Sequence, residues 1–403
     1  MLSPLTQAQS VRARRNWMRA RDLYFGRKAG EPGADRQHEG GTSASRRFDE
    51  RQGYGVNNDL ADRLAEGLGI KDDATTSSSH ANVAPTSDSE SGARFSVSRQ
   101  KVQNYISAIE EALDAGAKIQ SATTAAYDKQ LMGDLVIAAN RKRPGLNAHH
   151  VIGPENFAEK VVELLEKGET SFRLLVRDYV EGTHFMAFDV NHAGWGLSVV
   201  GIEPVAVGPN CEIDLAPRCR DSLREKIHDV AFMVVESEMQ ASCGVCGMFS
   251  LFLVKAMFKM ADEMISLHGD NLIMMNGMMD GMAGSGGENI STPTPWWRAS
   301  GDILSPRFMK HAQSDKRLVR YFLKNRGRKF ALSEDGTSTH AARADQDVNK
   351  RGESLADRYT RHWGEWSEFG GKKRWFSRSI EVKRLAEYQA LLAAIDEQNS
   401  GEP

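Results

Sequence analysis

The 403-residue sequence predicts an α+β fold with a central mixed sheet flanked by helices. Two patterns support this prediction. Segments before residue 170 and after residue 245 carry apolar residues at helical spacing, and the stretch between them contains β-branched and aromatic runs with short turns. The expected core thus has a group of strands in the middle of the chain, with helices before and after it.

Residues 1–97 are expected to be disordered. Between Val11 and Lys28 there are seven basic residues and one acid, with aromatic residues among them. Residues 72–93 are rich in Ser, Thr and Ala, contain four acids and no base, and show no apolar period. The basic arm would also suit a secretion or targeting segment or a weak membrane-surface helix. Ordered structure is predicted to start at Ser98.

The ordered part begins with three predicted helices, over 102–113, 127–140 and 155–167. Three runs then indicate adjacent antiparallel strands, namely FRLLVRDYV (172–180), THFMAFDV (183–190) and WGLSVVGIE (195–203). The nearly continuous apolar run VAFMVVES (230–237) predicts a buried central strand.

A long, mostly buried helix is predicted from Cys246 to about Gly269. Residues 271–301 are rich in Met, Gly, Ser and Pro and are interpreted as a loop, with methionines that serve packing. A basic helix is expected over 310–329, where eight Lys and Arg accompany one Asp and an apolar side faces the other way. Residues 379–395 predict a final helix.

The composition excludes several classes of protein. The net charge of -2 does not indicate a nucleic-acid partner, so no DNA is expected to be required for catalysis. No apolar run of about 20 residues predicts a transmembrane segment, and the N-terminus has neither a signal-peptide core nor a glycine at position 2. The four cysteines fit a reducing compartment. Neither they nor the methionines favour a metal site, so no metal is expected.

Three residues form a candidate catalytic constellation. His184 lies in the run 183–190, Glu203 ends the next strand, and Cys246 starts the long helix. Because residues two apart in a strand share a face, His184 and Asp189 should point in opposite directions, which favours Glu203 as the partner of His184. A helix N-terminus and a nearby histidine favour a thiolate. Cys246 would attack an acyl carbon, His184 would move the proton, and Glu203 would orient the ring.

The oxyanion of such a reaction would be bound by backbone N–H groups near Cys246 and by the side-chain amide of Gln240. Each residue also has a plainer interpretation. A strand histidine is often structural, and a single cysteine is often a small buried apolar residue. Cys243 and Cys246 form a C-x-x-C pair, but the βαβ start of a redox protein is missing. Spacing alone therefore leaves the triad as one of several interpretations.

The motifs around these residues resemble the YopJ family of type III secreted effectors, the serine/threonine/lysine acetyltransferases of animal and plant pathogens. They are HFMAFDV for the histidine, VVGIEP for the acid and QASCGVCGMFSLFLVKAM for the nucleophile. Four further segments resemble the family, namely NRKRPGLN (140–147), KHAQSDKRL (310–318), VNKRGESLADRY (348–359) and SIEVKR (379–384). The resemblance covers roughly residues 98–390. It implies a fold similar to that of ubiquitin-like-protein proteases with a Cys-His-acid triad. Cys243 departs from the family's pattern.

The resemblance also implies a reaction, an activator and a location. Cys246 would take acetyl from acetyl-CoA and pass it to Ser, Thr or Lys of a host protein, such as a kinase or an immune regulator, after secretion into the host cell. Inositol hexakisphosphate would act as activator, and converging Lys and Arg suit a polyanion. A charge run such as 310–329 is otherwise more often a solvated face. The candidate polyanion ligands are Lys310, His311, Arg317, Lys350, Arg358 and Arg384.

The sequence therefore predicts three regions. They are a disordered secretion or targeting region with its linker at 1–97, a catalytic core at 98–290, and a polyanion-binding regulatory region at 291–397 packed on the core. Two other functions stay open at this point. A cysteine protease acting on ubiquitin or a ubiquitin-like protein would use the same triad. A non-catalytic binding protein would not need the three residues that are intact here.

Overall fold

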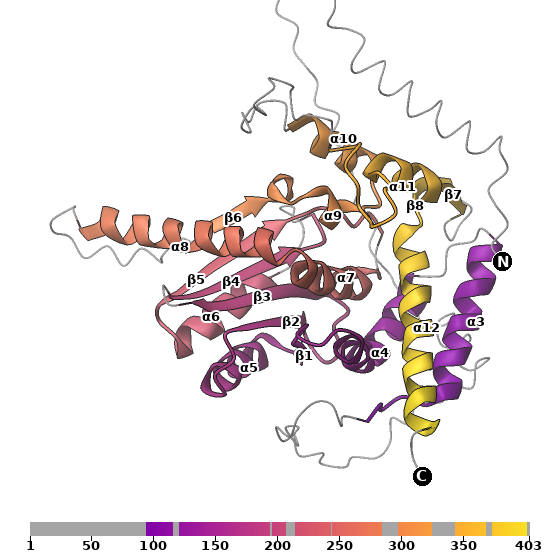
Figure 1. The fold of residues 1–403 in the computed structure, drawn as a ribbon, viewed down its shortest axis with the longest axis horizontal. Helices are drawn as coiled ribbons and strands as arrows, with labels where there is room; N and C mark the ends of the chain where they lie inside the picture. Colours follow the sequence, from indigo (N-terminus) through magenta and orange to yellow (C-terminus); the bar gives the residue numbers. More distant parts are fainter. Residues whose placement is uncertain are drawn as a thin grey trace, which may run out of the picture. The chain divides into compact units, whose positions relative to one another are not determined.

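A computed structural model shows how the middle and C-terminal parts of the chain are folded (Figure 1). It describes residues 94–115, 121–193, 196–206, 214–242, 244–283, 297–324, 343–367 and 373–400. These residues all belong to one compact unit, Ser87–Pro403. The basic arm and the acidic linker lie outside the described residues, whereas residues 94–97, which were predicted to be disordered, are described, and Ser96 and Val97 donate hydrogen bonds to Asp134.

The centre of the fold is a mixed sheet of six strands in the order β1-β2-β3-β4-β5-β6. Their bounds are β1 Ala148–Ile152, β2 Ser171–Arg177, β3 Phe185–Ala193, β4 Gly196–Glu203, β5 Val230–Glu236 and β6 Trp297–Ser300. The strands β2, β3 and β4 are antiparallel neighbours, as predicted, whereas β1 pairs with β2, β5 with β4 and β6 with β5 in parallel. The predicted α+β class with a central mixed sheet is confirmed.

Helices cover both faces of this sheet, and each face has its own hydrophobic core. On one face, α5 (Pro154–Glu166) packs against α6 (Leu215–Lys226). On the other lie α4 (Ser121–Lys142), α7 (Cys246–Lys259) and α8 (Ala261–Ala283) (Figure 1). Because β3 and β5 are buried on both sides, their sequences are almost continuously apolar rather than alternating.

The C-terminal elements assemble beside helix α7. They are η3 (Gly301–Ile303), α9 (Pro306–Met309), α10 (Asp315–Lys324), α11 (Leu355–His362), the β7–β8 hairpin (Trp363–Ser367 and Lys373–Ser377) and α12 (Ser379–Ser400). The helix α12 packs along α3 (Arg99–Asp114) and also contacts α4 and α7 (Figure 1). The last helix of the chain thus rests on the first described ones.

Three sequence predictions about the second half of the chain were wrong in extent. The long helix after Cys246 is two helices, because the chain breaks at Met260, which leaves helical geometry. Residues 271–283 continue α8 instead of starting a loop, since Leu267, His268 and Leu272 are buried on one side of it. The basic helix is shorter than 310–329. Among the described residues it starts at Asp315, five residues after Lys310, and forms α10, while residues 325–342 lie outside the described part.

None of the helices that the structure describes is long and apolar enough to cross a membrane. The helix α6 and the short strand β1 were not predicted, because Leu215–Lys226 is dominated by charged residues and Ala148–Ile152 is only five residues long. Both are held by tertiary packing, α6 against α5 and β1 against β2.

Candidate active site

The topology brings three separate chain segments to one edge of the sheet. Strands β3 and β4 are antiparallel, so the start of β3 lies beside the end of β4. Strand β5 runs parallel to β4, and the register pairs Glu203 with Glu236 at their ends. His184 directly precedes β3, Glu203 ends β4, and the chain leaving β5 leads into Cys246 at the start of α7. Residues up to 62 positions apart therefore converge at this edge.

The acid of the constellation contacts the histidine directly. Nε2 of His184 lies 3.0 Å from Oε2 of Glu203, whose other oxygen accepts a hydrogen bond from the backbone N–H of Val205 at 3.0 Å. The Glu203 side chain is almost completely buried, and that of His184 is 13% exposed. The carboxylate is thus fixed by the backbone, and it orients the imidazole ring.

The sulfur of Cys246 also acts on this ring, because it contributes to raising the pKa of His184. Burial lowers the pKa of His184, but the adjoining Glu203 carboxylate and the Cys246 sulfur outweigh burial and raise it to about 11. The ring is therefore an imidazolium at neutral pH, placed between two groups that carry or can carry negative charge.

Cys246 is the first residue of α7, where backbone N–H groups lack helical partners. Val245 at the N-cap makes no side-chain capping bond to them. The helix start is pressed close to its surroundings at Gly247, because a Cβ at this position would lie 2.9 Å from Met132 and 3.3 Å from the ring of Phe185. A side chain there would push the helix start away from the segment that carries His184.

Gln240 points its amide at the same sulfur. Its Nε2 lies 3.2 Å from Sγ of Cys246 and donates to the carbonyl oxygen of Ser242 at 2.8 Å. The backbone N–H of Gln240 donates to the carbonyl oxygen of Pro204, directly after Glu203. An N–H donor next to the nucleophile and an uncapped helix N-terminus together can stabilise an oxyanion on an acyl group attached to Cys246.

Asp189 is engaged elsewhere. Its carboxylate lies 2.7 Å from Nε of Arg173 and 3.0 Å from Nε2 of His268, in a buried group that includes Ser198. The strand-face reasoning that set Asp189 apart from His184 does not apply as stated, because His184 lies one residue before β3 and strand alternation does not fix its direction. Glu203 is nevertheless the carboxylate that meets the ring.

A second group of functional candidates forms a cationic cluster beside α7, at its C-terminal end. It consists of Arg143, Lys259, Lys310, Lys350, Arg358 and Lys383. Burial, and then the neighbouring charges of Arg358, Lys259, Lys383 and Arg143, lower the pKa of Lys310 to about 7. Burial followed by Arg143 and Lys383 lowers the pKa of Lys259 in the same way. Lys383 pairs with Glu387 and Arg358 with Glu353, but burial and the remaining positive charges still lower the pKa of Lys310 and Lys259, and a bound anion would oppose this effect.

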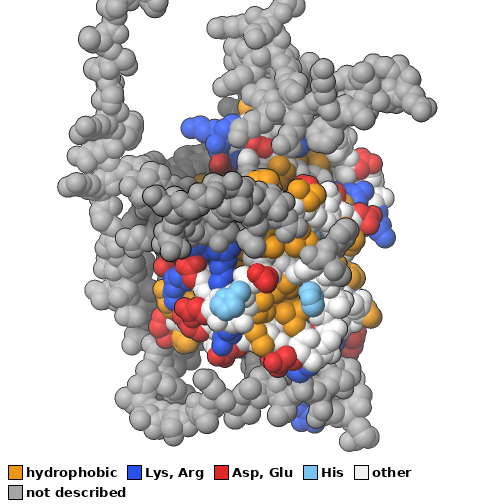
Figure 2. Space-filling model, turned by 90° about the vertical axis from the view of Figure 1, so that its left-hand side faces the viewer, with side chains coloured by type: hydrophobic (Ala, Val, Ile, Leu, Met, Phe, Trp, Pro, Cys, Tyr) orange, Lys and Arg blue, Asp and Glu red, His pale blue; other side chains and the backbone are white. Residues whose placement is uncertain are grey.

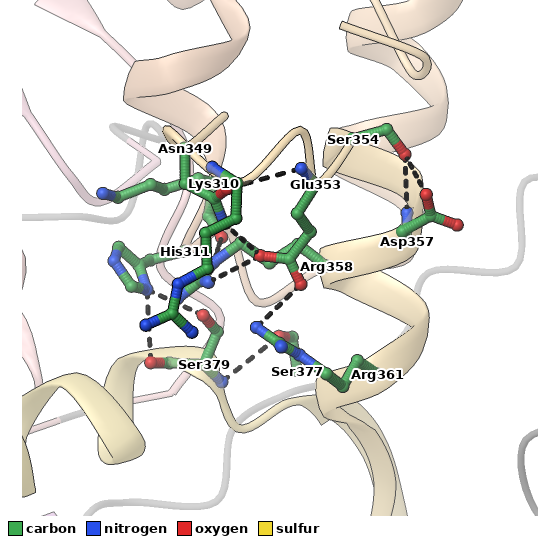
Figure 3. A network of polar contacts seen from close by, with 11 residues as sticks. Lys310, His311, Asn349, Glu353, Ser354, Asp357, Arg358, Arg361, Ser377 and Ser379 are labelled. Atoms are coloured by element: carbon green, nitrogen blue, oxygen red, sulfur yellow. Dashed lines mark hydrogen bonds and ion pairs between the residues drawn. The ribbon is translucent and has the colours of Figure 1, made fainter. Parts of the chain in front are cut away.

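Several contacts give this cluster a fixed frame (Figure 3). Nε of Arg358 donates to the carbonyl oxygen of Lys310 at 3.1 Å, and Nη1 of Arg358 lies 3.1 Å from a carboxylate oxygen of Glu353. Glu353 also pairs with Arg361 at 2.7 Å. His311 is buried behind Lys310, with Nδ1 2.7 Å from Oγ of Ser379. Helix α11 and the start of α12 are thereby tied to the segment around Lys310.

Of the six predicted polyanion ligands, the structure brings Lys310, Lys350 and Arg358 into the cluster and His311 beside it. Arg317 and Arg384 lie elsewhere in buried ion pairs, because each faces a buried carboxylate. Arg317 contacts Asp302 at 2.8 Å, and Arg384 contacts Asp128 with both oxygens at 3.0 Å.

Arg143, Lys259 and Lys383 were missed as candidate ligands. The signal for two of them was present, because Arg143 and Lys383 belong to NRKRPGLN and SIEVKR, two of the family-like segments. Lys259 ends the apolar helix α7 and has no such signal. The surface is not uniformly basic. On the face shown in Figure 2, acidic and basic side chains are interspersed around a hydrophobic band. The cationic cluster is therefore a local feature.

Comparison with known proteins decides which family has this arrangement. The model of the family described as YopJ serine/threonine acetyltransferase matches residues 102–390, well over half of the chain. The chain belongs to the YopJ acetyltransferase family. The match includes all residues of the candidate constellation and of the cationic cluster.

Individual relatives agree with this assignment. The serine/threonine-protein acetyltransferases YopJ of Yersinia pestis and Yersinia pseudotuberculosis are each 29% identical over 297 residues, which is 73% of this chain and 92% of theirs. A structure of AvrA with IP6 and CoA is 26% identical, with a TM-score of 0.58 over 73% of this chain and 99% of that one. HopZ1a in complex with IP6 and CoA, at 20% identity and a TM-score of 0.54 over 76% of this chain and 95% of its own, has the same fold.

Proposed function

We propose that this protein transfers acetyl from acetyl-CoA to a host protein through a thioester on Cys246. One observation carries the proposal: His184 lies between Glu203 and Cys246 while the amide of Gln240 lies on the sulfur. This arrangement brings together a nucleophile, a proton carrier, a carboxylate that orients it and a donor for the oxyanion. These four groups come from different segments of the chain.

In the first half-reaction, the sulfur of Cys246 would attack the acetyl carbon of acetyl-CoA. The carbonyl oxygen becomes an oxyanion, which the Gln240 amide and the N–H groups at the start of α7 would stabilise. The bond from carbon to the CoA sulfur then breaks, and the imidazolium of His184 gives its proton to the departing thiolate. The products are free CoA and acetylated Cys246, with neutral His184.

In the second half-reaction, a hydroxyl or amine of the acceptor protein would attack the thioester. Neutral His184 takes the proton of the attacking group, and the Cys246 sulfur leaves as thiolate next to the imidazolium so formed. Glu203 stays a carboxylate throughout and keeps the ring oriented. The site thereby returns to its starting state, with one acetyl group moved.

We propose further that inositol hexakisphosphate binds the cationic cluster and activates the enzyme. The structures of AvrA and HopZ1a with IP6 and CoA support the proposal that the present chain binds the same polyanion. The residues here fit a polyanion, because burial and then the positive charges of Arg358, Lys259, Lys383 and Arg143 lower the pKa of Lys310, and Nη1 of Arg143 is buried with no partner among the described residues. The bound polyanion would supply negative charge that makes the convergence of these side chains favourable.

In this proposal, Lys310, Lys350, Arg358, Arg143, Lys259 and Lys383 hold the phosphates, and His311 supports Lys310 from behind. Arg317 and Arg384 act instead as buried structural partners of carboxylates. The regions proposed are a catalytic core at 98–290 and a regulatory region at 291–397. The residues 1–97 are proposed for secretion through a type III system into the host cell, where kinases or immune regulators would be the acceptors.

The competing function is a cysteine protease for ubiquitin or ubiquitin-like proteins, which would use the same three residues. The two activities separate in one experiment. Release of CoA from acetyl-CoA is measured with and without inositol hexakisphosphate, and cleavage of ubiquitin with a fluorogenic C-terminal amide is measured in parallel. We expect polyanion-dependent release of CoA, its loss in Cys246→Ala, and no cleavage of ubiquitin. Cleavage of ubiquitin without release of CoA would support the protease instead.

A further inference from the structure

The loop that carries Gln240 is held in place from outside by one segment of the regulatory region. This loop, residues 237–242, joins β5 to the turn before Cys246 and has no regular secondary structure. Ser237 and Gln240 of this loop bond the carbonyl oxygens of Glu203 and Pro204, and further hydrogen bonds to the loop come from residues 313–320. Arg317 donates to the carbonyl oxygen of Ser237 at 2.6 Å, and Arg320 pairs with Glu238. The remaining contacts are made by Gln313.

Gln313 is completely buried and uses every polar group it has on its neighbours. Its side-chain oxygen accepts hydrogen bonds from the backbone N–H groups of Ala241 at 2.9 Å and Ser242 at 3.1 Å. Its side-chain Nε2 lies 3.0 Å from Oγ of Ser242. Its backbone N–H donates to the carbonyl oxygen of Met239 at 2.9 Å, and its carbonyl oxygen accepts from the N–H of Ser377 at 3.2 Å.

These contacts fix the residues on both sides of Gln240. Ser242 matters most, because its carbonyl oxygen is the acceptor that holds Nε2 of Gln240 at 2.8 Å while the same nitrogen reaches Sγ of Cys246. Displacing Ser242 would therefore displace the amide from the sulfur. The loop also contains a non-glycine residue in the left-handed region, Glu238 with φ 53°, a conformation that needs external support to persist.

We infer that Gln313 is a positioning residue for the acyl-transfer reaction, which holds the Gln240 loop so that the amide stays on the Cys246 sulfur. The inference rests on the proposed function, in which Gln240 stabilises the oxyanion. Gln313 lies three residues after Lys310 of the cationic cluster. The segment that would bind the polyanion therefore also contacts the loop 237–242, which carries Gln240. Gln313 itself touches neither substrate nor sulfur.

A double-mutant cycle tests this inference. Gln313→Met keeps the approximate volume and removes both polar atoms, while Gln240→Ala removes the proposed oxyanion donor. Both variants and their combination are assayed for kcat and KM of CoA release, in the full chain and at saturating inositol hexakisphosphate. Asn271→Ala serves as control, because Asn271 is an equally buried amide that bonds Ser198 and Val199 far from Cys246.

We expect Gln240→Ala to lower kcat by about 10²–10³-fold and Gln313→Met by up to about 10²-fold, with little change in the KM of acetyl-CoA. The double variant should be no slower than Gln240→Ala alone, because both remove the same donor. Asn271→Ala should leave kcat unchanged at temperatures where the protein is folded. Gln313→Glu, which keeps an oxygen for the two N–H donors, should recover part of the loss.

The inference would be overturned if the fold-loss of kcat in the double variant equalled the product of the losses in the two single variants. A wild-type kcat in Gln313→Met would overturn it as well. If Gln313→Met does not fold, Gln313→Glu replaces it in the cycle. A loss of kcat in that double variant equal to the product of the two single losses would overturn the inference in the same way. The proposed function fails separately, when the wild-type protein does not release CoA or when Cys246→Ala still does. The two failures are therefore told apart in the same set of assays.

Discussion

At the scale of single residues, Cys246 differs from Cys219 in what surrounds the sulfur. Cys219 is fully buried in the core between α5 and α6, and burial raises the pKa of its thiol well above the usual value. Cys246 instead lies at a helix start, beside an imidazolium and an amide. Both of these described cysteines are buried, and of the two only Cys246 has a cationic ring and an amide donor beside its sulfur, which is the environment that activates a nucleophilic cysteine.

The protonation of His184 is the most direct residue-scale prediction. Its pKa of about 11 lies above the usual 6.5, so the stabilisation from the charged ring is fully present below pH 6.5 and is lost as the pH rises towards 11. Glu203→Gln removes the strongest contribution that raises this pKa, and we expect the His184 pKa to fall. Titration of the ring by NMR in wild type and variant measures both values. A wild-type ring that titrates near 6.5 would refute the ion-pair description.

At the scale of elements, the buried residue Arg384 joins α12 to α4 and to Gly244, which lies just before α7. Arg384 contacts Asp128 with two bonds of 3.0 Å, and its Nη2 also lies 3.4 Å from the carbonyl oxygen of Gly244, two residues before Cys246. Arg384→Met leaves the Asp128 carboxylate buried without its cation, which should lower the free energy of unfolding by about 3–5 kcal/mol. Thermal or urea unfolding measures this change.

A matched control exists at the surface. Arg99 pairs with Asp396 at 2.6 Å and also joins α12 to an earlier helix, but both side chains are about half exposed. Arg99→Met should therefore have a much smaller effect on unfolding than Arg384→Met. Equal effects of the two substitutions would show that the buried pair is not what fastens α12.

The elements that the sequence predicted well are those whose periodicity is strong. The strands at Phe172, Phe188 and Val200 were predictable because apolar runs bounded by turns have few other interpretations. The continuation of α8 through a Met- and Gly-rich stretch was not, because its cause is the contact of one helix side with β4. Local propensity gives no signal for such tertiary support.

The residues of the candidate site were likewise predictable only where the signal is local in sequence. His184, Glu203 and Cys246 are recognisable from motifs, since each motif is local in sequence. The partners of buried arginines are not, because a basic residue in a family-like segment can equally face a phosphate or a buried carboxylate. Arg317 and Arg384 were assigned to the first group and lie in the second. Gln313 lies in the family-like segment KHAQSDKRL, but its contact with a loop 71 residues earlier could not be predicted from that segment.

At the scale of the whole molecule, the cationic cluster joins segments from α4 to α12, so its occupancy bears on the entire fold. Lys310 has a pKa of about 7 and is partly neutral at neutral pH. A bound polyanion favours the charged form and should raise this pKa, so binding should take up protons. Calorimetry of inositol hexakisphosphate binding in buffers of different ionisation enthalpy measures the uptake.

We expect Lys310→Met to reduce both the affinity for inositol hexakisphosphate and the proton uptake, and the affinity of the wild type to fall with added salt. Lys316→Met is the control, because Lys316 belongs to the same basic stretch but is not among the charges acting on Lys310. Equal proton uptake in wild type and Lys310→Met, or an equal loss of affinity in Lys316→Met, would place the polyanion elsewhere.

The thioester on Cys246 is the central claim, and mass spectrometry of the protein after brief exposure to acetyl-CoA and inositol hexakisphosphate tests it most directly. We expect an acetyl group, removable by hydroxylamine, on the peptide that contains Cys246, with fragmentation assigning it to Cys246 rather than Cys243. The adduct should persist in Cys243→Ala and disappear in Cys246→Ala, together with release of CoA. An adduct on Cys243, or acetyl transfer by Cys246→Ala, would contradict the mechanism.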